Sequence, residues 1–139
     1  YDVVDGPGPD FIVFENPLLV SPYNPFAEPA HVGVSSAGTR AADFTEFPCD
    51  LTTTAGDPGS KSWPYPGCAG VRPVLANVAT NAIPPTDPTK AGGDPFDLAT
   101  IGVKQARYIR LRDAGVSTMG STSAGFDLDA VVLINYKKR

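Results

Sequence analysis

Basic residues and histidines are scarce in this sequence, and long apolar runs are missing. Its 139 residues include 11 Lys and Arg against 15 Asp and Glu, with one His and a formal net charge of −4. Because nucleic-acid phosphates are bound by basic surfaces, this balance argues against a nucleic-acid partner. No stretch approaches the roughly 18 consecutive apolar residues of a membrane-spanning helix, so no membrane span is predicted.

Motifs of catalysis are also missing. The single histidine, His31, lies in a strand-like run, where a structural role is expected. The chain has neither a G-x-S-x-G nucleophile motif nor a glycine-rich phosphate-binding loop. Paired carboxylates can hydrolyse glycosidic bonds, but a chain of this length leaves little room for a substrate cleft. We therefore expect a binding or structural protein rather than an enzyme.

Proline and glycine are plentiful, with 15 Pro and 14 Gly scattered without a repeat, and they interrupt any long helix. Short runs with the pattern of strands lie between them, at Phe11–Glu15, Ala30–Ser36, Ala106–Asp113 and Asp127–Asn135. At most one short helix is expected near Asp94–Gly102, capped by Asp94 with Pro95 in its first turn. We predict an all-β fold, an antiparallel β-sandwich or jelly roll with long loops, formed by one domain over residues 1–139.

Two cysteines, Cys49 and Cys68, bracket a loop rich in proline and glycine. An even pair around such a loop is typical of a disulfide in a secreted chain, and the alternative is two buried free thiols. Closing a loop of this length stabilises a fold by ~3 kcal/mol in the chain-entropy model. The pair predicts a disulfide-bounded insertion over residues 49–68 and an extracellular or cell-surface location.

Acidic residues gather in the DGPGPD loop, in GGDPFDL and in FDLD, and Glu15 closes the first predicted strand. Calcium takes six to eight oxygen ligands from carboxylates, carbonyls and water, and a site without His or Cys favours calcium over zinc or copper. The alternatives are carboxylates exposed at the rim, or hydrogen-bonded to loop N–H groups. We expect at least one Ca²⁺ at one rim of the sandwich, with ligands drawn from Asp5, Asp10, Glu15, Asp94, Asp97, Asp127 and Asp129.

Aromatic residues mark the candidate ligand contacts. Trp63 and Tyr65 lie in the Cys-bounded loop between prolines, where they could stack on a sugar ring or anchor a protein partner. The alternative is that Trp63 covers the core beneath the loop. Tyr23 and Phe26 form a second pair, for which packing is the expected role. One face of a predicted strand carries Tyr108, Arg110 and Arg112. This face could hold an anionic or hydroxyl-rich ligand, and the alternative is that it is simply solvated.

Five motifs follow one another along the chain: VVDGPGPDFIVFEN, AHVGVSSAG, GGDPFDLA, RYIRLRDAG and GFDLDAVVLIN. Together they resemble a group of secreted bacterial cell-surface domains that look like calcium-binding, galactose-binding-like (discoidin-type) jelly rolls. The likeness covers Val3 to Asn135 except for the Cys-bounded insertion. It implies that fold and compartment, and it carries over as acidic motif positions Asp5, Asp10, Asp97, Asp127 and Asp129.

One departure from the resemblance concerns the first strand. Related chains usually carry a further Gly-rich strand before DGPGPD, whereas here the motif begins at Asp5. Either that strand is missing or another segment covers the exposed edge, because open edges invite pairing with another chain.

These observations together predict an extracellular, calcium-stabilised binding or adhesion module that recognises a surface carbohydrate. The alternative is a structural subunit of a cell-surface assembly, a homo-oligomer or filament that a neighbour's strand completes.

Overall fold

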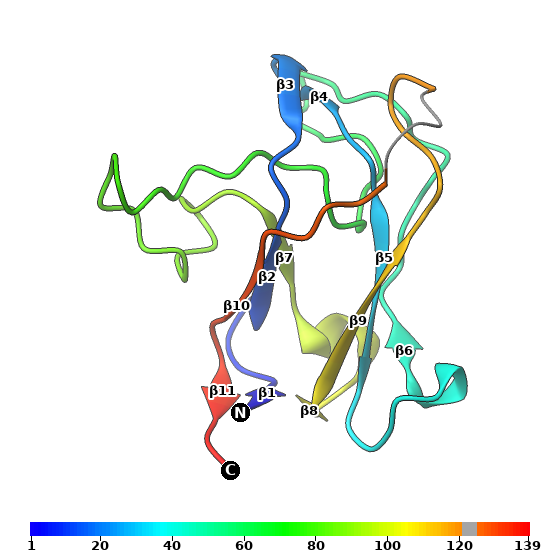
Figure 1. Cartoon of the computed structure of the whole chain (residues 1–139), viewed down its shortest axis with the longest axis vertical. Coiled ribbons are helices and arrows are strands. Elements are labelled where there is room, and N and C mark those ends of the chain that lie inside the picture. The colour runs from blue at the N-terminus through cyan, green and yellow to red at the C-terminus, as the bar shows by residue number, and fades with distance from the viewer. Residues whose placement is uncertain (121–124) are drawn as a thin grey trace.

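The computed structural model describes residues 1–120 and 125–139, and these residues form short antiparallel strands and two 3-10 helices (Figure 1). The all-β prediction is therefore confirmed. The strands are β1 (Asp2–Val4), β2 (Phe11–Phe14), β3 (Leu18–Ser21), β4 (Asn24–Phe26), β5 (Ala30–Ser35), β6 (Thr45–Glu46), β7 (Asp94–Phe96), β8 (Gln105–Ala106), β9 (Tyr108–Asp113), β10 (Ala130–Leu133) and β11 (Tyr136–Lys137). The helices are η1 (Ala41–Asp43) and η2 (Leu98–Ile101). Within the described ranges, no helix is long and apolar enough to cross a membrane.

Two three-stranded sheets contribute to one core. Their strand orders are β10-β2-β7 and β6-β5-β9, and β2 and β5 lie in the middle (Figure 1). Successive side chains of a strand point to opposite faces, so Phe11 and Val13 of β2 face the core from one sheet. Val32 and Val34 of β5 enter the same core from the other sheet. These four side chains are almost completely buried, which contributes about 1.5–3 kcal/mol each.

The second face of β2 is also buried, which explains why FIVF shows no polar alternation. Ile12 and Phe14 pack under residues 71–92, which form the long excursion beside β2 and β10 in Figure 1. The excursion is closed by hydrogen bonds from the amides of Leu75 and Ala76 to the carbonyl of Ala91, at 2.8 and 2.9 Å. β2 is therefore buried on both of its faces. The residues just before and just after β2 lie at opposite ends of the sandwich.

A strand does precede the DGPGPD loop. β1 lies between β8 and β11, so both of its edges are paired within the chain. The same pairing brings the two termini together at one end of the molecule (Figure 1). Arg139 Nε donates to Asp2 Oδ1 at 2.9 Å across this junction.

Several predicted element boundaries are wrong. The short helix begins at Leu98, and its cap is Asp97, whose side chain accepts from the Ala99 amide. Asp94 belongs instead to β7, because pairing with β2 extends the backbone there and places Pro95 opposite Ile12. The predicted strand from Asp127 to Asn135 is shorter, since β10 covers only Ala130–Leu133, and the predicted strand Ala106–Asp113 is interrupted at Arg107.

The predicted disulfide is confirmed. Cys49 and Cys68 are bonded, and their Cα atoms lie 4.6 Å apart. Around the bond, Tyr65 and Val71 form a small buried cluster, against which Trp63 packs. The disulfide therefore holds the insertion against the body of the sandwich.

Candidate functional site

The structure brings three of the seven predicted calcium ligands together and places the other four at the opposite end of β2. Asp10 comes immediately before β2 and Glu15 immediately after it. At about 3.3 Å per residue, these positions are about 16 Å apart along the strand. We refer to the carboxylates at the first end as the Asp10 group, consisting of Asp5, Asp10 and Asp97. Those at the second end form the Glu15 group, consisting of Glu15, Asp94, Asp127 and Asp129.

The Asp10 group is organised by hydrogen bonds to its central carboxylate, which is completely buried. Asp10 Oδ1 accepts from the Gly6 amide at 2.9 Å and from Asn135 Nδ2 at 2.8 Å. Asp10 Oδ2 accepts from the Leu98 amide at 2.8 Å. A buried carboxylate with three donors is compensated for its lost hydration. Asp10 therefore ties the DGPGPD loop to η2 and to the end of the chain.

The other two carboxylates of the Asp10 group also have partners. Lys104 Nζ lies 2.6 Å from Asp5 Oδ2, and this hydrogen bond raises the pKa of Lys104. Asp97 Oδ1 accepts from the Ala99 amide at 2.8 Å. One oxygen from each of the three carboxylates still lies within 4.8 Å of the others. The group is thus the one place, among the described residues, where three possible metal-ligating side chains converge.

The Glu15 group has fewer compensating partners. Glu15 follows Val13 on the inner face of β2 by strand alternation, and Asp94 of β7 is opposite Val13. Glu15 Oε2 is buried and has no hydrogen-bond partner. Burial, followed by the negative charges of Asp129 and Asp94 and of other nearby carboxylates, raises the pKa of Glu15 to about 7. Asp127 and Asp129 themselves are exposed, as one of the alternatives predicted.

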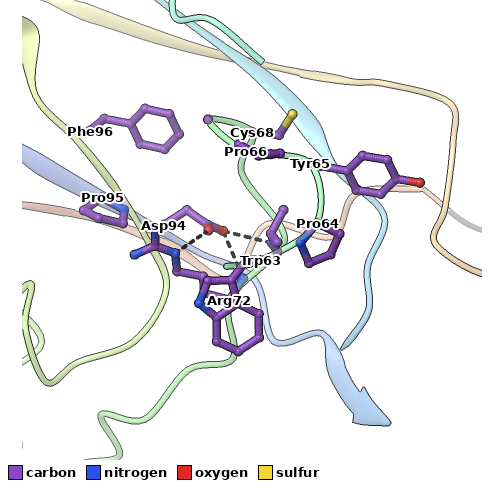
Figure 2. A pocket seen from close by; sticks show the side chains of 11 residues that line it. Trp63, Pro64, Tyr65, Pro66, Cys68, Arg72, Asp94, Pro95 and Phe96 are labelled. Carbon is purple, nitrogen blue, oxygen red and sulfur yellow. Dashed lines mark hydrogen bonds and ion pairs between the residues drawn. The ribbon is translucent and has the colours of Figure 1, made fainter. Parts of the chain in front are cut away.

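Asp94 is a structural member of the Glu15 group and is almost completely buried. Its Oδ2 accepts from the amides of Val71 and Arg72, at 2.9 and 3.5 Å. Arg72 Nε lies 3.8 Å from Asp94 Oδ1, and Figure 2 shows this pair beside Trp63. Burial nevertheless raises the pKa of Asp94 to about 6. Asp94 therefore connects β7 to the chain just after the Cys-bounded insertion.

A groove of about 420 Å³ lies between the β3–β4 hairpin and the segments that follow the disulfide. Tyr23 and Trp63 form an aromatic wall, with ring centroids 4.8 Å apart and planes inclined at 49°. Tyr23 has a positive φ of 62°, an uncommon conformation for a residue other than glycine, in the turn between the two strands. Arg72, Leu19, Leu75 and Thr89 are among the other lining residues. The groove thus combines aromatic and aliphatic surface with one guanidinium.

The sequence predicts that Trp63 and Tyr65 are ligand contacts in the loop, and for Tyr65 this prediction is wrong. Tyr65 is 2% exposed and packs with Cys68 and Val71, and burial raises its pKa. Trp63 is half-buried, packs against that cluster with one part and lines the groove with another. Its aromatic neighbour in the groove is Tyr23, which sequence reasoning assigned to packing. Arg72 was missed, because the sequence around it carries no signal that a groove forms there.

The predicted ligand contacts on the polar face of β9 lie away from the groove. Arg110 forms an ion pair with Glu46 of β6, and its guanidinium lies 4.2 Å from the centroid of the Phe44 ring. Arg112 is exposed and pairs across the strands with His31 of β5. Tyr108 lies under Arg107, at 5.5 Å. None of Tyr108, Arg110 and Arg112 lines the groove beside Trp63, so the two sets of predicted ligand contacts are separate.

Comparison with protein families, curated proteins and solved structures found no match.

Proposed function

We propose that this chain is an extracellular binding module that recognises a carbohydrate in the groove beside Trp63. The observation that supports the proposal is the groove itself. Its volume of about 420 Å³ lies within the usual range of about 300–1,000 Å³ for ligand sites. An indole and a phenol ring form one wall, and such rings can contact the apolar face of a pyranose.

The walls of this groove are held in place before any ligand arrives. Trp63 packs on the cluster around the Cys49–Cys68 bond, and Pro22, Pro73 and Pro88 restrict the backbone of the opposing segments. A preformed site loses less conformational entropy on binding. The disulfide also supports an extracellular location, because such bonds persist in oxidising compartments.

A glycan array tests the carbohydrate proposal, with the unaltered protein and Trp63→Ala compared at equal concentration. We expect the unaltered protein to be retained on a defined set of glycans, and the variant to bind them at least about tenfold more weakly. Thermal melting of both proteins checks that the variant is folded. Equal retention of both proteins, or retention of neither, contradicts the proposal.

We also propose calcium as a stabilising ion, bound by the Asp10 group. The convergence of three carboxylates within 4.8 Å supports this assignment, because calcium prefers several oxygen ligands. An ion bound only by the folded state raises the melting temperature. We expect several degrees of difference between 1 mM calcium and excess chelator, and a much smaller difference for Asp97→Asn. An unchanged melt, with no calcium detected by elemental analysis, excludes the ion.

A second candidate function is supported by the surface of β3. Its residues Leu18, Leu19 and Val20 are 71%, 46% and 54% exposed, and among the described residues β3 pairs only with β4. An exposed apolar strand with a free edge is a typical site of pairing between chains. This observation favours a subunit of a surface assembly. Size-exclusion chromatography and electron microscopy distinguish the candidates, because oligomers or fibres support the assembly and a glycan-binding monomer supports the module.

A further inference from the structure

Arg72 is the one charged side chain among the described residues that line the groove. Its side chain is 46% exposed, although it lies beside the buried Asp94. A guanidinium presents five N–H donors in a planar fork that matches the geometry of carboxylate and other oxyanions. The groove therefore contains a positive charge within a chain whose formal net charge is −4.

Asp94 neutralises the positive charge of the Arg72 guanidinium only in part. The shortest contact, Nε to Oδ1, is 3.8 Å, which is beyond hydrogen-bond distance. Asp94 Oδ2 is used by the amides of Val71 and Arg72. The guanidinium has no hydrogen-bond partner in the part of the chain that the structure describes, so its donors are available to a ligand.

Trp63 and Arg72 both line the groove, and both also line the smaller neighbouring pocket that Figure 2 shows. A sugar ring in contact with the indole therefore has its substituents within reach of the guanidinium. The remaining wall, with Leu19, Leu75 and three prolines, offers apolar surface for the C–H groups of the ring. The other lining residues with polar side-chain groups are Thr89, Tyr23 and Trp63, which carry two hydroxyl groups and an indole N–H.

We infer that the groove takes an acidic saccharide, with a pyranose face on Trp63 and its carboxylate or sulfate on Arg72. This inference rests on the proposed carbohydrate function and assigns the class of sugar. Charge-assisted hydrogen bonds to an anion are stronger than those to a neutral hydroxyl, so the guanidinium favours acidic over neutral sugars. If Arg72 served only to hold Asp94, the sugar's charge would make no difference to binding.

The intrinsic fluorescence of the protein offers a direct assay, because Trp63 is the only tryptophan. Digalacturonic acid, galactose 6-sulfate and neutral galactobiose are titrated separately at low salt. We expect at least one acidic sugar to bind about tenfold more tightly than galactobiose. This advantage should shrink as sodium chloride is added, because salt screens the charge. Comparison of the two acidic sugars distinguishes carboxylate from sulfate recognition.

Three variants then test the role of Arg72. Arg72→Gln should lose the tenfold preference because its affinity for the acidic sugar falls far more than its affinity for galactobiose, and Arg72→Lys should keep part of the preference because the charge remains. Arg107→Gln is the matched control, since Arg107 is exposed between β8 and β9 and does not line the groove. Thermal melting checks the fold of each variant, and the salt dependence of the unaltered protein tests the inference even if Arg72→Gln does not fold.

The outcomes separate this inference from the proposed function. Equal affinity for acidic and neutral sugars, independent of salt, overturns the acidic specificity while carbohydrate binding stands. Binding of none of the three sugars, together with no retention on the glycan array, overturns both. An acidic preference that persists in Arg72→Gln also overturns the assignment to Arg72.

Discussion

The two ends of β2 hold similar residues in different electrostatic states. At the first end, Asp10 is completely buried and accepts three hydrogen bonds. At the second, Glu15 has a buried oxygen without a partner and a pKa raised to about 7. The DGPGPD loop and η2 direct backbone N–H groups at Asp10, whereas the chain after Glu15 soon reaches Pro17, which has no N–H to donate. Backbone donors, rather than the number of carboxylates, decide which cluster is stabilising.

The largest expected effect is at Asp10. Asp10→Ala leaves the amides of Gly6 and Leu98 and the amide side chain of Asn135 without their buried acceptor. At about 1–3 kcal/mol for each unsatisfied group, partly relieved by water, we expect a loss of about 3–5 kcal/mol in the free energy of unfolding. Urea denaturation measures it. Asp5→Ala, measured like the others in the presence of chelator, is the control, because its partner Lys104 is exposed, and it should shift the midpoint far less.

Loss of the disulfide should destabilise mainly the end of β2 that carries Glu15. Replacing Cys49 and Cys68 by serine opens a loop whose ends are 19 positions apart in the sequence, which costs about 3 kcal/mol in the chain-entropy model. Hydrogen exchange should become faster at the Val71 amide, which is bonded to Asp94 close after the insertion. The amides bonded to Asp10 should change less than that of Val71. Uniform acceleration at both ends would show that the two ends unfold as one unit.

A smaller effect should appear in the pH dependence of stability. Glu15 binds its proton more tightly in the folded state, with a pKa of about 7 against 4.5 for the ordinary group. The folded state therefore holds more protons between these pH values, and the free energy of unfolding falls as pH rises from about 4.5 to 7. Because Glu15 is partly exposed, solvent screening limits the loss to on the order of 1–2 kcal/mol.

Glu15→Gln tests this assignment by urea denaturation from pH 5 to pH 8 in the presence of chelator. The variant should match the unaltered protein at low pH and exceed its stability at pH 8. Asp94 should still contribute a decline between its ordinary range and about pH 6, because its pKa is also raised. A variant whose stability declines with pH as steeply as that of the unaltered protein would remove Glu15 as the source.

Local pattern predicted the strands and the disulfide, because both depend on residues close in sequence or on a single pairing. Alternation identified β5 and β9, and two cysteines left only one bridge to form. The hydrogen-bond partners of the carboxylates could not be predicted in this way. Two of the three donors to Asp10 come from Leu98 and Asn135, which lie 88 and 125 residues away.

The candidate groove was predictable only in part. Trp63 was recognised as a rigid aromatic, but its partner in space is Tyr23, 40 residues earlier in the chain. Tyr65 lies between Pro64 and Pro66 and is buried, with a positive φ of 48° that the sequence does not reveal. Arg72 gains its importance from the hairpin and the excursion that surround it, and neither arrangement is visible in a single sequence.

The paired termini have a practical consequence. Tyr1 and Arg139 lie at the same end of the long axis, whereas the β3–β4 hairpin lies at the opposite end (Figure 1). Anchoring the polypeptide to a bead, a sensor chip or a carrier through either terminus therefore leaves the hairpin, with Leu19 and Tyr23, directed outward. Copies joined in tandem would each extend away from the linkers, with the β3–β4 hairpin facing the surrounding medium.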